Sequence, residues 1–212
     1  MFEIEYKGGN TLVVSSKKTT LVVDPRRSLV GQNDLAVGGA IELATEPRFA
    51  LNSQGAKLCI EGPGEYEIGD MAIRGVRAWR HLDAESEEPI DTIYRIEIGG
   101  VRIAVIGNIM PKVSEEQLEA VGIVDIVVIP VGGNGYTLDA ESAAAIVRQI
   151  DPRAAIPVHY ADTSLQYEVT QDEVDRFIKE LAAPVEEVGT KYKLKSAAAL
   201  PATLTTVIVG RS

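Results

Sequence analysis

The segment from residue 123 to residue 160 constrains the fold of this chain most. Residues 124–130 form a nearly continuous β-branched run, which is typical of a strand buried on both faces. A glycine-rich turn follows, and residues 140–150 then place apolar side chains on one helical face behind Asp139, a predicted N-cap. Residues 154–158 predict a second buried strand. The segment therefore predicts two strands joined by a helix, with His159 directly after the second strand.

His159 and the glycine-rich turn are the two candidate functional features of this segment. Ligands and metals in α/β proteins are bound at the carboxyl ends of strands, where His159 stands. The alternative is a structural histidine that makes one hydrogen bond. The turn consists of Gly132, Gly133, Asn134 and Gly135. Its amides either cradle an anion or serve only to turn the backbone tightly.

Composition narrows the class of protein. The 212 residues carry a formal net charge of −10, which argues against nucleic acid and anionic membranes as partners. No apolar run reaches membrane-spanning length, the start of the chain does not resemble a signal peptide, and Cys59 is the only cysteine. We expect a cytoplasmic globular protein with a single domain over 1–212, while its oligomeric state stays open.

The remaining elements follow from alternation, turns and capping patterns. Serine or threonine followed three residues later by glutamine or glutamate predicts helices at 114–121 and 171–182. The acidic stretch 83–91 is interpreted as a solvated loop. Residues 65–76 predict a pair of strands around Gly69-Asp70. Further strands are predicted at 2–6, 11–14, 20–23, 40–45, 57–60, 92–98, 101–106, 185–188, 191–194 and 205–209.

The order of several motifs resembles the metallo-β-lactamase fold, in its branch of small zinc-dependent hydrolases. The resemblance rests on Asp24-Pro25 at a strand end, the turn GPGEYE at 62–67, Gly107-Asn108, and the segment 123–160. It covers nearly the whole chain. The fold that it implies is α+β, a four-layer αββα sandwich of two mixed β-sheets.

The resemblance also implies where metal ligands would stand. Active members hold two metals through a THxHxDH motif, a later histidine, a bridging aspartate and a last histidine. In this chain those seven ligand positions are occupied by Glu46, Arg48, Ala50, Leu51, Arg80, Asn108 and His159. His81 stands one residue after Arg80. Only His159 matches, which falls short of the three protein ligands that a catalytic zinc requires.

We therefore expect a metal-free, non-catalytic protein that binds a small molecule or another protein. The cleft at the strand ends is predicted to contain Asp24, Glu46, Arg48, His81, Asn108 and His159. Arg48 is predicted to replace the lost metal charge and to pair with Asp24 or Glu46, because its planar guanidinium suits a carboxylate. The alternative is a metal-dependent hydrolase with an unusual site made by His159, Glu46 and Asp24.

Overall fold

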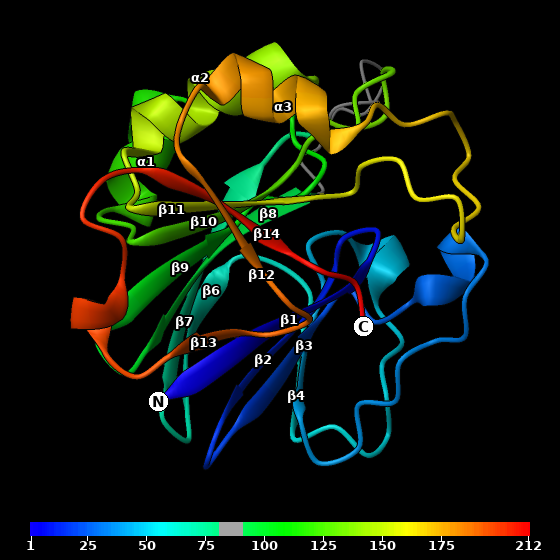
Figure 1. The fold of residues 1–212 in the computed structure, drawn as a ribbon. Coiled ribbons are helices and arrows are strands. Elements are labelled where there is room, and N and C mark those ends of the chain that lie inside the picture. The colour runs from blue at the N-terminus through cyan, green and yellow to red at the C-terminus, as the bar shows by residue number, and fades with distance from the viewer. Residues whose placement is uncertain (81–90) are drawn as a thin grey trace.

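The computed structural model describes residues 1–80 and 91–212, and its strands form two sheets that pack face to face (Figure 1). The first sheet has six strands, with three antiparallel pairings followed by two parallel ones. In spatial order its strands are β13 (Tyr192–Leu194), β1 (Phe2–Gly8), β2 (Thr11–Ser16), β3 (Thr20–Val23), β4 (Ile41–Leu43) and β5 (Leu58–Ile60).

The second sheet has eight strands and is parallel at one end and antiparallel at the other. In spatial order its strands are β12 (Val185–Val188), β14 (Thr205–Val209), β11 (Ala154–Val158), β10 (Ile126–Pro130), β9 (Val101–Val105), β8 (Asp91–Ile98), β7 (Met71–Ala78) and β6 (Gly64–Ile68). The five strands from β12 to β9 are parallel to one another. The segment 123–160 thus forms β10, a helix and β11, as its pattern predicts.

The main core lies between the two sheets. Alternate residues of each strand point into it, so Ile4 and Leu12 of one sheet meet Ile96 and Ile156 of the other in a single apolar cluster. All four side chains are fully buried. This is the arrangement of a two-sheet sandwich, and the predicted fold class is confirmed.

The outer faces of the two sheets are covered differently. The helices α1 (Glu115–Val121), α2 (Ala140–Ile150) and α3 (Val174–Leu181) lie over the eight-stranded sheet (Figure 1). Val37 and Ala40, from the long connection between β3 and β4, pack on Val22 of the six-stranded sheet. That connection and the next contain two short 3-10 helices, η1 (Arg27–Val30) and η2 (Pro47–Phe49); η3 (Ala197–Ala199) lies near the C-terminus. None of the described helices has the length and apolarity needed to span a membrane.

Two of the three predicted helix starts are confirmed. The side chain of Asp139 accepts a hydrogen bond from the Ser142 amide at 2.8 Å, and Ser114 forms a capping box with Gln117. The third start is wrong by three residues, since α3 begins at Val174 and not at 171.

The reason for the later start of α3 is a tertiary contact. The amide of Asp172 donates to the carbonyl of Gly132 at 2.7 Å, and its carbonyl accepts from the amide of Ala161 at 2.9 Å. The residues before Val174 are therefore tied to the glycine-rich turn in an extended conformation. Local capping patterns carry no information about such a partner.

Shortening one side chain on the buried face of α2 tests how tightly the helix packs. Ile146 is buried and Gln149 is exposed on the same helix. We expect Ile146→Val to lower the free energy of unfolding by about 0.5–1.5 kcal/mol, because the lost methylene leaves a small cavity. Denaturant unfolding measures this, with Gln149→Ala expected within about 0.5 kcal/mol of the parent. Equal effects of the two changes would contradict the packing of this face.

Candidate functional site

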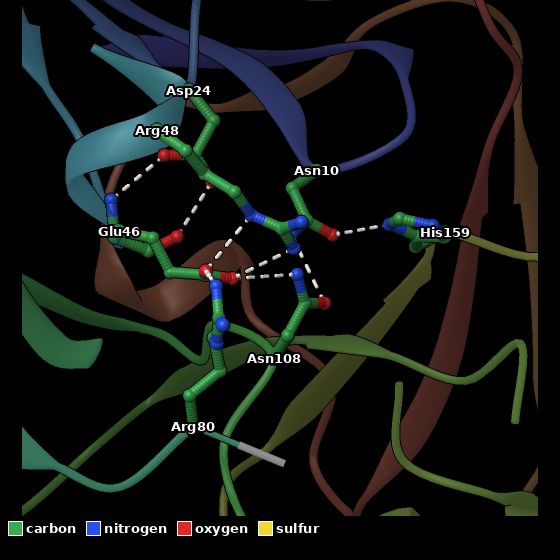
Figure 2. Close-up of polar contacts among 8 residues, drawn as sticks. Asn10, Asp24, Glu46, Arg48, Arg80, Asn108 and His159 are labelled. Atoms are coloured by element: carbon green, nitrogen blue, oxygen red, sulfur yellow. Dashed lines mark hydrogen bonds and ion pairs between the residues drawn. The ribbon is translucent and has the colours of Figure 1, made fainter. Parts of the chain in front are cut away.

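The candidate site lies where strands from both sheets end (Figure 2). Asp24 directly follows β3, and Glu46 follows β4 by three residues. Asn108 and His159 follow β9 and β11 of the other sheet. Because parallel strands end at a common edge, this topology brings together residues that are far apart in the sequence.

Glu46 is the centre of the site. Its carboxylate is fully buried and contacts three side chains (Figure 2). Arg48 approaches it with two nitrogens: Nε lies 2.9 Å from Oε2, and Nη2 donates to Oε1 at 3.2 Å. Arg80 Nη1 donates to Oε2 at 3.1 Å, and Asn108 Nδ2 donates to Oε1 at 3.0 Å. The salt bridge predicted for Arg48 is thus formed, with Glu46 as its partner.

Arg48 is fixed by aromatic rings as well as by Glu46. Its guanidinium carbon lies 4.7 Å from the ring centroid of Phe49 and 4.9 Å from that of Tyr136. These are cation–π distances. The side chain of Arg48 is still 25% exposed, so the guanidinium is at the mouth of the site while the carboxylate of Glu46 is at its base.

Asp24 does not pair with Arg48. Its two carboxylate oxygens accept hydrogen bonds from the amide and the hydroxyl of Thr45, both at 2.7 Å. The residue has a φ of 48°, in the left-handed region that asparagine and aspartate tolerate best. Burial outweighs the bonds from Thr45 and raises the pKa of Asp24 to about 8. Asp24 is therefore protonated over most of the physiological range.

His159 is connected to Glu46 through two carboxamides. Its Nδ1 lies 2.9 Å from Asn10 Oδ1, and Asn10 Nδ2 donates to Asn108 Oδ1 at 3.2 Å. His159 has a φ of 50°, and its ring stacks on that of Tyr167 with centroids 4.9 Å apart. Burial, and secondarily the charge of Arg48, lowers the pKa of His159 to about 3. The imidazole is therefore neutral at physiological pH.

A further buried acid, Asp91, was not anticipated. It begins β8 and is 1% exposed, and neither carboxyl oxygen has a hydrogen-bond partner in the described part of the chain. Burial, together with the negative charge of Glu46, raises its pKa well above the ordinary value. Gly107 makes room for this carboxyl, since an added Cβ would overlap its oxygens. The sequence places this residue at the end of the predicted solvated loop, which is wrong for Asp91 because it begins β8 and is buried; residues 83–90 of that loop lie outside the described residues.

The glycine-rich turn at 132–135 contacts other groups of the protein at several of its residues. The Gly133 amide donates to the carbonyl of Leu138 at 3.0 Å and also contacts the hydroxyl of Thr137 at 2.8 Å. Gly132 packs against the carbonyl of His159 and the side chain of Gln171, where a Cβ would not fit. These contacts favour the structural interpretation of this turn, while anion binding by its other amides stays an untested prediction.

The structure adds residues to the predicted cleft and leaves one undescribed. His81 lies outside the described residues. Asn10 and Tyr136 enter the site from the turn between β1 and β2 and from the loop before α2, and their sequence contexts indicate only turns. Beside the ring of His159 is a cavity of about 20 Å³. Its lining residues are Gly8, Gly9, Asn10, Thr11, Asp24, Arg26, Leu29, Val30, Phe49, Tyr136 and His159.

Comparison with known protein families gives one match that covers most of the chain. The family model described as "Beta-lactamase superfamily domain" matches residues 3–159, more than half of the 212 residues. A UPF0173 metal-dependent hydrolase of Carboxydothermus hydrogenoformans is 28% identical over 102 residues, and a UPF0173 protein of Pyrococcus furiosus is 35% identical over 105 residues. These alignments cover 46% and 50% of this chain, and 44% and 46% of the relatives. The chain therefore matches less than half the length of either relative.

Solved structures resemble this chain over nearly its full length. A protein of the metallo-β-lactamase superfamily from Thermotoga maritima superposes with a TM-score of 0.77 at 20% identity, over 99% of this chain and 100% of that one. A metallo hydrolase from Ignicoccus hospitalis superposes with a TM-score of 0.62 at 14% identity, over 92% of this chain and 99% of that one. At such identities the likeness is one of fold.

Proposed function

The chain belongs to the family of the beta-lactamase superfamily domain, and from that premise we propose that it is a metal-free member that works as a non-catalytic binding or interaction protein. The observation that carries the proposal is the buried ion pair between Glu46 and Arg48. It stands at the positions where the family resemblance puts metal ligands. A permanent guanidinium charge replaces there the charge of a metal ion.

The side chains present at those positions do not suit a zinc ion. The Glu46 carboxylate already accepts from Arg48, Arg80 and Asn108, so a metal would have to displace these partners. Asn108 turns its amide nitrogen, which has no lone pair to offer, toward Glu46. In residues 1–80 and 91–212, no three histidine, cysteine, aspartate or glutamate side chains are grouped closely enough to hold a metal ion. A catalytic zinc needs about three such ligands.

The alternative is a metal-dependent hydrolase that uses His159, Glu46 and Asp24. Its support is the similarity to the relative from Carboxydothermus hydrogenoformans, which is described as a metal-dependent hydrolase. Against it, the carboxylate of Asp24 is bound to Thr45 and that of Glu46 to two arginines. The three side chains would need to exchange these partners before they could share one ion. The metal-free proposal requires no such rearrangement.

Elemental analysis of protein purified without chelators tests the proposal. We expect far less than one zinc, manganese or iron per chain, and no change in the melting temperature on adding chelator or zinc. His159→Ala and His81→Gln each remove one imidazole, so the second variant controls for metal held elsewhere. About one metal ion per chain, lost in His159→Ala and kept in His81→Gln, would support the hydrolase alternative and overturn the proposal.

A further inference from the structure

The polar groups between Glu46 and His159 form one chain of hydrogen bonds with a fixed direction (Figure 2). Glu46, an ionised carboxylate held by two arginines, is able only to accept. The Asn108 group 3.0 Å away must therefore be its NH2. The Asn108 oxygen then faces Asn10, and the Asn10 NH2 donates to it at 3.2 Å. This leaves the Asn10 oxygen facing His159.

This direction decides which imidazole nitrogen carries the proton. The Asn10 oxygen lies 2.9 Å from His159 Nδ1 and has no proton to give, so Nδ1 must be the protonated nitrogen. The other nitrogen, Nε2, then presents a lone pair. It is buried and has no hydrogen-bond partner among the protein groups described. A buried acceptor without a partner is unfavourable, and such sites in proteins are commonly satisfied by bound water.

We propose that Glu46 fixes the tautomer of His159 through Asn108 and Asn10, and that Nε2 accepts a hydrogen bond from one water-sized donor in the adjoining cavity. That cavity has a volume of about 20 Å³, and a single water needs about 10–15 Å³. Thr11 and Asp24 are among the residues that line it. The tautomer does not depend on the proposed function, whereas the bound water rests on the site being free of metal.

The water is held at this site and not activated. A general base works best when its pKa is close to the operating pH, and the low pKa of His159 makes it a weak base. Glu46 and the two asparagines are accordingly positioning residues for the imidazole. The arrangement keeps a buried polar group satisfied at the position where the family resemblance places the last metal-binding histidine.

Nitrogen-15 NMR of the imidazole rings tests the tautomer, because protonated and unprotonated ring nitrogens resonate far apart. The chain has two histidines, so His81→Gln assigns the His159 signals. We expect the Nδ1–H form in at least about a tenfold excess over the Nε2–H form. Reversing the direction of the hydrogen bonds would leave buried polar groups unpaired. In Glu46→Gln the side chain that ends the series of hydrogen bonds is able to donate as well as accept. The excess of the Nδ1–H form should therefore fall about tenfold.

Two further variants make this test specific. Glu42→Gln neutralises another buried carboxylate, one that accepts from the amides of Leu51, Asn52 and Ser53, and should leave the tautomer unchanged. Asn108→Ala interrupts the series of hydrogen bonds between Glu46 and His159, while Glu46 keeps both arginines. This variant therefore tests the tautomer even where Glu46→Gln does not fold. The tautomer inference is overturned where Glu46→Gln and Asn108→Ala both retain the parent ratio.

The bound water is tested by a high-resolution crystal structure of the whole chain. We expect density for one water within hydrogen-bond distance of His159 Nε2. The absence of such density at a well-ordered Nε2 would overturn the water site. Density at about 2.0–2.1 Å from Nε2, a zinc–nitrogen distance, would overturn the proposed function and the water together, while the NMR ratios would still decide the tautomer.

Discussion

Replacing Glu46 by alanine is expected to lower the free energy of unfolding by about 3–5 kcal/mol, which is the usual consequence of breaking a buried ion pair by removing one partner. The carboxylate is fully buried and satisfies Arg48, Arg80 and Asn108 together. The value should lie toward the lower end, because the two arginine side chains are 25% and 20% exposed and water compensates part of the loss. Denaturant unfolding at neutral pH measures it.

The matched control for this change is a glutamate–arginine pair on the surface. Glu65 lies 2.6 Å from Arg74, and their side chains are 71% and 42% exposed. Glu65→Ala should lower the free energy of unfolding by less than about 1 kcal/mol, since exposed ion pairs contribute little. A similar loss in both variants would mean that Glu46 is not what holds the strand-end site together.

Replacing Asp24 by asparagine is expected to stabilise the protein progressively as the pH rises. The pKa of Asp24 is raised from its ordinary 3.8 to about 8 in the folded protein. Between these values the folded state keeps a proton that the unfolded state has released. Stability therefore falls with rising pH in this window, by about 1.4 kcal/mol per pH unit, and stops falling above pH 8. The asparagine variant lacks this decline.

From pH 5 to pH 8, the free energy of unfolding of Asp24→Asn should rise by about 3–4 kcal/mol relative to that of the parent. Asparagine suits the site, because it tolerates the φ of 48° and is able to hydrogen-bond both groups of Thr45. His159 contributes with the opposite sign: its lowered pKa makes stability rise with pH up to about 6.5, where the unfolded histidine loses its proton. Comparing variant and parent at each pH removes that contribution.

An exposed carboxyl provides the control for the change of charge. Asp175 lies on the exposed side of α3. Asp175→Asn should shift the free energy of unfolding by an amount that does not vary between pH 5 and pH 8. A difference between Asp24→Asn and the parent that is also constant over this range would contradict the raised pKa of Asp24.

Local patterns in the sequence predicted most of the fold. Side-chain periodicity identified β10, α2 and β11, and the residues that begin α1 and α2 were correct because capping acts within one helical turn. The ordered motifs then indicated the two-sheet sandwich. The start of α3 was wrong because its position is set by the contact between Asp172 and Gly132, whose partners are 40 residues apart in the sequence.

By itself, the sequence placed Asp24, Asn108 and His159 near strand ends, and it led to the prediction that most of the family's metal-binding side chains are replaced. Only the tertiary structure decided which groups pair. Arg48 had two candidate carboxylates, and it pairs with Glu46, while both oxygens of Asp24 are bound to Thr45. Asn10 reaches His159 across 149 positions of sequence. Hydrogen bonds of this kind depend on where the strands place each side chain in space, and spacing along the chain does not contain that information.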